Sequence, residues 1–319
     1  MLKGENVERK RFTTAKIILF TLLGVFLFFF IILPLGFVYL IGSFSPSSSD
    51  VVGSGNVALI PIEGVITTDG GSYFNEQTIS SKNIVEFIED ADKNSQVEAI
   101  VLEINSPGGS AVASDEISIA VKKVKKPVVA MIREVGASGG YWVASSADYI
   151  VAHRMAITGS IGVISSYLEF SGLMENHGVG YERLVAGKYK DIGTPFRELG
   201  NEERDLLQSK LDVIHEYFIQ EIAENRKLPL NKVRQTATGE FYLGVEALKL
   251  GLIDEVGDKE TVELYLKEKH NIEEPTYITF KKELGFFELL SGVFNEFFFH
   301  LGKGISSRLA SPENKVMAV

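Results

Sequence analysis

A serine flanked by glycines is the residue of this chain best suited to nucleophilic chemistry. Ser138 lies in Gly136-Ala137-Ser138-Gly139-Gly140, after an apolar run at 127–132 that is expected to be a buried strand and before the helix-compatible residues 143–147. A hydroxyl at a strand-to-helix turn is presented at a helix N-terminus, where free N–H groups favour negative charge. The stretch therefore predicts a nucleophile beside an oxyanion site, while an ordinary glycine-rich turn is the structural alternative.

A serine nucleophile needs a base, and two kinds are conceivable. The stretch matches the G-x-S-x-G pattern, in which an acid and then a histidine follow the serine, but none of the five histidines lies in an obvious turn after an acidic strand end. A neutral lysine can replace the histidine. Lys188 and Lys190 follow Gly187 and are the candidates, and spacing alone does not choose between them. The chain has no cysteine, which excludes a thiolate nucleophile and a cysteine metal site.

The elements that must position these residues alternate between strands and helices. This alternation predicts repeated β-α-β units, a mostly parallel sheet and an α/β fold. A further short strand is expected at 182–186, and a long helix at 202–226 with Asn201 as its N-cap. The other expected strands are 57–62, 65–67, 97–104 and 149–152, and the other expected helices are 83–91, 111–123 and 244–250.

The amino-terminal part contains a long uncharged stretch. Residues 17–43 carry no charge and are numerous enough to span a bilayer. Five basic residues precede the stretch, and the next basic residue after it is Lys82, so the amino terminus is expected in the cytoplasm and the remainder outside it. A cleaved signal peptide is the alternative, but the apolar stretch is too long and no clear small-residue cleavage site follows.

Composition and local sequence character predict how the chain is divided into segments. The chain has 319 residues and a net charge of −10, which argues against a nucleic-acid partner. We expect a cytoplasmic segment at 1–16, a transmembrane anchor at 17–43, a flexible linker at 44–56, a catalytic domain at 57–275 and a carboxyl-terminal tail at 276–319. From Leu284 the tail has the pattern of an amphipathic helix, which could lie on a membrane or pack on the domain.

Several ordered motifs give the chain a family resemblance. From about Ala58 to Val256 it resembles the signal peptide peptidase A family of membrane-anchored serine proteases, in the short form with one anchor and one catalytic domain. The resemblance implies a β-α spiral of the Clp-protease/crotonase type after one transmembrane helix. It rests on Asn105-Ser106-Pro107-Gly108-Gly109, Gly136-Ala137-Ser138-Gly139-Gly140-Tyr141, Thr158-Gly159-Ser160-Ile161-Gly162, Gly187-Lys188-Tyr189-Lys190-Asp191 and Thr238-Gly239-Glu240 with residues 247–254.

The resemblance also implies roles for individual residues. Ser138 is expected to be the nucleophile and Lys190 the general base, with Ser160 orienting the lysine. Gly108 and Gly139 are expected to donate backbone N–H groups to an oxyanion hole. No metal or other cofactor is implied.

The implied activity is cleavage of remnant signal peptides and other apolar peptides at the membrane. The long family form carries its lysine and its serine in separate halves. A single-domain chain is therefore expected to form a homo-oligomeric ring, in which one copy could lend Lys190 to the Ser138 of its neighbour.

Two other functions stay open at this stage. A related membrane serine protease acts on stomatin-like proteins, but its serine and lysine lie closer together than these two. The chain could also be an inactive scaffold with a crotonase-like fold. A crotonase that binds acyl-CoA in the cytoplasm is opposed by the anchor and its orientation.

Overall fold

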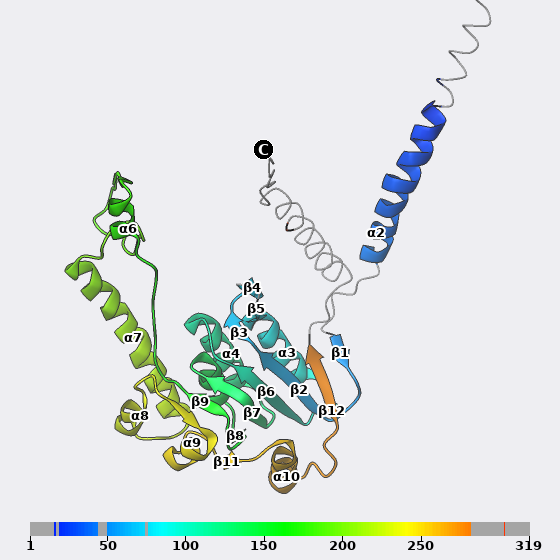
Figure 1. Cartoon of the computed structure of the whole chain (residues 1–319). Coiled ribbons are helices and arrows are strands. Elements are labelled where there is room, and N and C mark those ends of the chain that lie inside the picture. Colours follow the sequence, from blue (N-terminus) through cyan, green and yellow to red (C-terminus); the bar gives the residue numbers. More distant parts are fainter. Residues whose placement is uncertain (1–15, 17–18, 44–49, 74–75, 282–302, 304–319) are drawn as a thin grey trace, which may run out of the picture. The chain divides into compact units, whose positions relative to one another are not determined.

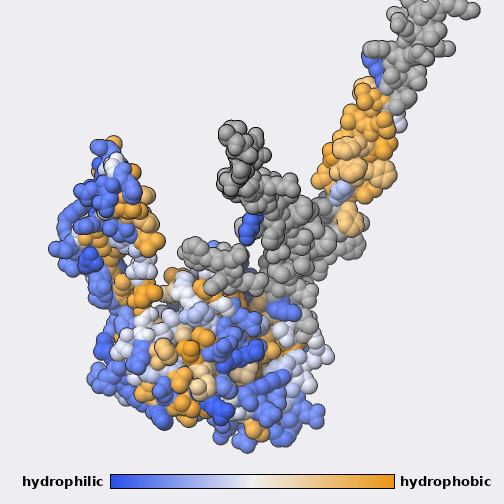
Figure 2. All heavy atoms as spheres, viewed as in Figure 1, coloured by the Kyte–Doolittle hydropathy of each residue, from blue (hydrophilic) through white to orange (hydrophobic). Residues whose placement is uncertain are grey.

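The computed structural model describes residues 16, 19–43, 50–73, 76–281 and 303, so the expected tail helix lies outside the described residues. The chain divides into one unit of residues 1–48 with 283–319 and a second unit of residues 49–282. In the first unit, η1 (Phe28–Ile32) continues into α2 (Leu33–Ser43). Within the described residues, Leu19–Phe37 is the one stretch of helix long and apolar enough to cross a membrane, and its apolar surface is evident in Figure 2.

The second unit is built on a mostly parallel sheet (Figure 1). Parallel pairing joins β12, β2, β6, β7, β8 and β11 in that order, with β1 antiparallel at the β12 edge. This confirms the predicted α/β class. The strands are β1 (Asp50–Val52), β2 (Val57–Glu63), β6 (Ala99–Ser106), β7 (Val128–Ala137), β8 (Tyr149–Ala152), β11 (Glu255–Val256) and β12 (Tyr277–Lys281), and a separate small sheet holds β3 (Val65–Thr67), β4 (Gly71–Tyr73) and β5 (Glu76–Ser80).

The alternation of side chains along the strands builds two cores. In β6, Ile100, Leu102 and Ile104 face one buried cluster, whereas Ala99 and Val101 face the other. The larger cluster packs the sheet against six helices, and the smaller packs it against α10 (Lys259–His270). The six helices are α3 (Ser81–Lys93), α4 (Ala111–Lys123), α5 (Gly139–Ser145), α7 (Asn201–Asn225), α8 (Leu230–Thr236) and α9 (Gly244–Leu250).

Strand β7 is the element that carries the site. Its first half pairs with β8, and its last three residues pair with β9 (Ile157–Gly159), which continues to the antiparallel β10 (Phe241–Leu243). The buried Thr158 hydroxyl donates to the Gly136 carbonyl at 2.8 Å and fixes this second pairing. The turn after β7 is therefore held between two neighbouring strands.

An arm, defined here as residues 163–213, extends from the sheet and includes α6 (Ser171–Asn176) and the first half of α7 (Figure 1). No residue between Ile161 and Phe218 is buried. The second half of α7 is fixed to the sheet unit, because Phe218 stacks on Trp142 of α5 with ring centroids 4.6 Å apart. The arm is followed by α8 (Leu230–Thr236) and α9 (Gly244–Leu250), which return the chain to β11.

Three sequence expectations are wrong in detail. Residues 182–186 form no strand, because no neighbouring strand lies beside them to complete a ladder. Asn201 is the first residue of α7, and the N-cap is Gly200. The sheet also extends past the expected domain limits of 57 and 275, because β1 and β12 pair with each other and β12 pairs with β2.

Candidate active site

Ser138 occupies a strained turn between β7 and α5. Its backbone has φ 51° and ψ −122°, and its N–H donates to the Gly159 carbonyl at 2.8 Å. Only four described non-glycine residues have a positive φ, and Ser138 and Ser160 are two of them. Such strain persists where the surrounding structure enforces it, which is frequent at active sites.

The hydroxyl of Ser138 is free for chemistry. Ser80 and Ser110 are the N-caps of α3 and α4, and the hydroxyl of each accepts a hydrogen bond from a backbone N–H group of its helix. The Ser138 hydroxyl makes no such capping hydrogen bond, although Ser138 is the N-cap of α5. The turn therefore presents a partly exposed hydroxyl that its own helix does not occupy.

A glycine loop after β6 lies directly against this turn. A Cβ on Gly108 would stand 2.6 Å from the Gly139 nitrogen and 2.9 Å from the Ser138 Cβ, and the Gly108 φ of +100° also favours glycine. A Cβ on Gly139 would stand 3.2 Å from the Gly109 nitrogen. The fold thus brings Gly108, Gly109 and Gly139 together at Ser138.

The hydrogen bonds of this loop distinguish its two glycines. The Gly108 N–H donates to the buried Ser106 hydroxyl at 3.1 Å, and that hydroxyl donates to the Gly64 carbonyl at 2.6 Å. In the described part of the chain, the Gly109 N–H has no acceptor. Gly139 is the first residue of α5, so its N–H has no acceptor within the helix. The donor that the sequence analysis assigned to Gly108 is therefore occupied in this structure.

Ser160 lies one residue beyond the Gly159 carbonyl that binds Ser138. Its φ is 50°, its N–H donates to the Glu240 carbonyl at 2.9 Å, and its hydroxyl makes only a long contact of 3.4 Å with the Gly239 carbonyl. Ser160 thus belongs to the same group of residues as Ser138, and its hydroxyl is partly exposed.

Lys190 is not brought to this group within one chain. It lies on the arm, its side chain is exposed, and no hydrogen bond or ion pair joins its amine to another described residue. Residues 187–191 form turns, with the Lys190 N–H donating to the Gly187 carbonyl at 3.1 Å.

Lys188 differs from Lys190 in its surroundings. Its amine contacts the Glu202 carboxylate at 2.5 and 2.6 Å. The hydrogen bond with Glu202, followed by that with Tyr189, raises the pKa of Lys188. A lysine whose charged form is stabilised in this way is poorly suited to accept a proton.

Other side chains do not complete an alternative site. In the described part of the chain, no histidine is hydrogen-bonded to Ser138, and the His215 ring instead contacts the Ile161 carbonyl at 3.2 Å. No group of three or more metal-ligating side chains suited to an ion is found among the residues described. Sequence reasoning missed the role of Ser106 in the glycine loop, although Ser106 lies inside a motif that it singled out.

Comparisons with known proteins place relatives of this chain among proteases. Residues 120–273 match peptidase family S49. A putative protease of Methanocaldococcus jannaschii is 34% identical over 281 residues, which are 86% of this chain and 90% of that protein. A putative signal peptide peptidase SppA of Enterococcus faecium is 31% identical over 231 residues, covering 71% of this chain and 67% of that protein. Protease 4 of Haemophilus influenzae is 32% identical over 204 residues, which are 63% of this chain but 32% of that protein.

Proposed function

The chain belongs to the signal peptide peptidase A family, peptidase family S49, and on this basis we propose that it is a membrane-anchored serine endopeptidase whose nucleophile is Ser138 and whose base is Lys190. The observation that carries the proposal is the strained turn of Ser138, with its free hydroxyl and two N–H groups beside it.

The reaction follows from these groups. The Ser138 hydroxyl passes its proton to the neutral Lys190 amine, and its oxygen attacks the scissile carbonyl carbon. The developing oxyanion accepts hydrogen bonds from the N–H groups of Gly139 and Gly109. We propose Gly109 rather than Gly108 because the Gly108 N–H already donates to the Ser106 hydroxyl. The ammonium of Lys190 then protonates the leaving amine as the peptide C–N bond breaks. Water hydrolyses the resulting acyl-enzyme by the same proton transfers in reverse.

The choice of Lys190 over Lys188 has a physical reason. The Glu202 carboxylate stabilises the ammonium of Lys188, which opposes proton acceptance. The amine of Lys190 makes no ion pair with a described residue.

The exposed arm supports a closed ring in which neighbouring copies share their sites. Its apolar side chains include Ile164 and Leu184, which are each 90% exposed. Exposed apolar side chains gathered on one segment are typical of a contact with another protein or with a membrane, and orange patches are visible on the arm in Figure 2. We propose that a second copy covers the arm and receives Lys190 beside its own Ser138.

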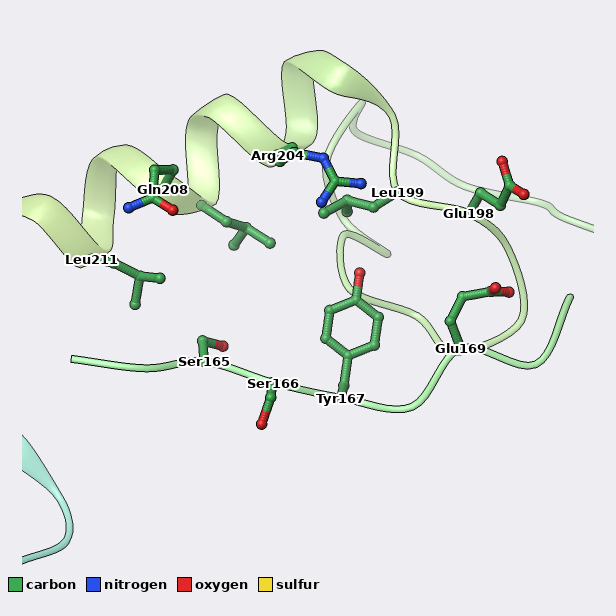
Figure 3. Close-up of a pocket in the computed structure, with 10 residues that line it drawn as sticks. Ser165, Ser166, Tyr167, Glu169, Glu198, Leu199, Arg204, Gln208 and Leu211 are labelled. Carbon is green, nitrogen blue, oxygen red and sulfur yellow. The ribbon is translucent and has the colours of Figure 1, made fainter. Parts of the chain in front are cut away.

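The arm contains a cavity in which a side chain of the second copy could bind. It has a volume of about 470 Å³ and lies between residues 165–169 and the first half of α7 (Figure 3). Leu199, Leu207 and Leu211 supply apolar walls, and the Tyr167 hydroxyl and the Arg204 guanidinium point into it.

The anchor sets the place of the reaction. The apolar helix at Leu19–Phe37 is compatible with a membrane anchor. We propose that the basic residues before it stay in the cytoplasm and that the protease acts outside, on signal-peptide remnants left in or near the membrane.

The proposal is tested with the full-length protein in detergent. Cleavage of a fluorogenic apolar peptide should be abolished by Ser138→Ala. The control Ser95→Ala, which removes an exposed hydroxyl from the turn after α3 and lies outside the arm, should leave it unchanged. Equal turnover by Ser138→Ala and wild type would overturn the assignment, and no cleavage by wild-type protein of any apolar peptide would favour an inactive scaffold.

A further inference from the structure

The residues on both sides of Lys190 are fixed by ionic contacts, while Lys190 itself is not. Before it, Lys188 and Tyr189 both contact the Glu202 carboxylate. After it, Asp191 receives two hydrogen bonds from Arg183, at 2.6 and 2.7 Å. Lys190, the proposed base, is thus the one side chain of residues 188–191 that makes none of these contacts.

Arg197 is the centre of these contacts. Its Nε and Nη2 donate to the two Asp191 oxygens, both at 3.2 Å. Its Nη1 and Nη2 donate to the two Glu203 oxygens, at 2.7 and 2.6 Å. Glu203 also accepts the Gly200 N–H at 3.1 Å, which ties the cluster to the start of α7.

These ion pairs are better shielded than the arm around them. The side chains of Asp191 and Glu203 are 15% and 13% exposed, and that of Arg197 is 23% exposed. Two-point contacts between a guanidinium and a carboxylate fix orientation as well as distance. The backbone hydrogen bonds of the turn are short-range ones, such as that from the Lys190 N–H to the Gly187 carbonyl at 3.1 Å.

From this geometry we propose that Arg183, Asp191, Arg197 and Glu203 form a positioning cluster that holds the turn 187–191 rigid and presents the Lys190 amine to the serine. The inference rests on the proposed function, because it assigns the cluster to the base of that reaction. None of the four residues touches the substrate or the reacting atoms. They act by limiting how far the lysine can move from the position in which it accepts the Ser138 proton.

The test replaces the centre of the cluster. Arg197→Met keeps much of the side-chain volume and removes all four hydrogen bonds to carboxylates, and we expect kcat to fall by about 10- to 100-fold with KM nearly unchanged. Arg197→Lys keeps the charge without the two-point geometry and should recover only part of this loss. Asp191→Asn, which preserves the shape of the carboxylate, should lower kcat in the same direction.

Arg234→Met is the matched control. Arg234 makes a two-point contact with Glu216 at 2.6 and 2.9 Å, away from the turn, and its loss should leave kcat within about twofold. Wild-type kcat in Arg197→Met and Asp191→Asn, in a preparation in which Lys190→Ala is inactive, would overturn the cluster and leave the proposed function standing. Full activity of Lys190→Ala would instead overturn the proposed base.

Mixed oligomers separate positioning from general stability. Arg197→Met subunits carry an intact Ser138, so mixing them with Ser138→Ala subunits should restore activity through the intact lysine and cluster of the second copy. Mixing them with Lys190→Ala subunits should restore none. Recovery with Lys190→Ala would show that the arginine does not act with the lysine and would overturn the proposal.

Discussion

Substitution of Gly108 by alanine is the change for which the structure gives the sharpest expectation. The new Cβ would stand 2.6 Å from the Gly139 nitrogen and 2.9 Å from both the Ala137 oxygen and the Ser138 Cβ. None of these atoms is the end of a flexible side chain, so the loop and the turn must separate by about 0.8 Å to reach ordinary contact at 3.4 Å. This movement would shift the glycine loop, with the Gly109 N–H proposed for the oxyanion, away from Ser138.

The expected cost of Gly108→Ala has two parts. The positive φ costs an L residue about 1–2 kcal/mol, and overpacking costs about 1–3 kcal/mol more. The free energy of unfolding should therefore fall by about 2–5 kcal/mol. Displacement of an oxyanion donor by most of an ångström should lower kcat by about 100- to 1000-fold.

A second glycine separates the clash from the backbone strain. Gly71 has a φ of +125°, has nothing within 4 Å of its Cβ position and lies outside the arm, so Gly71→Ala carries the strain alone. The assay measures kcat on a fluorogenic peptide and the thermal unfolding midpoint for both variants. Near-wild-type kcat in folded Gly108→Ala, or an equal loss of kcat in Gly71→Ala, would refute the reasoning.

Three further predictions concern the lysines, the arm and the membrane. Lys188→Ala should keep most activity, whereas Lys190→Ala should abolish it in an intact oligomer. Lys190→Arg should abolish it too, since a guanidinium does not deprotonate. The reverse result in a peptide-cleavage assay would make Lys188 the base. Hydrogen bonds from Arg197, followed by the Gly200 N–H, lower the pKa of Glu203 to about 2, and Arg183 and then Arg197 lower the pKa of Asp191. Because these carboxyls have lowered pKa values in the folded state, their contribution to the stability of the arm is present above about pH 4 and is lost as the pH falls toward 2. Amide hydrogen exchange in residues 183–203, corrected for the intrinsic rate, should therefore stay constant from pH 7 to 5. A loss of protection already at pH 5 would contradict this. Protease added outside spheroplasts should degrade the catalytic domain, and protection of that domain until lysis would refute the proposed orientation.

The sheet and its serine could be predicted because the signals are local. Apolar runs predict β2, β6 and β7, and the glycines around Ser138 mark the turn after β7. Helices α4 and α9 and strand β8 occupy the residues that the sequence indicated. The family membership confirms the expected Clp-protease type of fold.

The arm could not be predicted in the same way. Leu184 and Val185 suit a strand by residue type, but they are exposed and have no neighbouring strand. An alternating or continuous apolar pattern indicates burial but does not identify the partner surface, so the pattern alone does not show against what such residues pack.

The finer features of the site depend on contacts between distant segments. The Ser106 hydroxyl selects which glycine N–H is free, and no spacing in the sequence encodes that choice. Arg183, Asp191, Arg197 and Glu203 follow no helical or strand period, so their convergence is evident only in the folded arm. The pairing of β1 with β12 joins residues more than two hundred positions apart and shows no local signal.

The central claim is that Ser138 of one copy works with Lys190 of its neighbour, and complementation tests it most directly. Full-length Ser138→Ala and Lys190→Ala proteins, each expected to be inactive alone, are mixed under conditions in which subunits exchange. Cleavage of the fluorogenic peptide is then measured in oligomers shown to contain both. The account predicts that activity returns, because some sites then combine an intact serine with an intact lysine. No activity in proven mixed oligomers would contradict it.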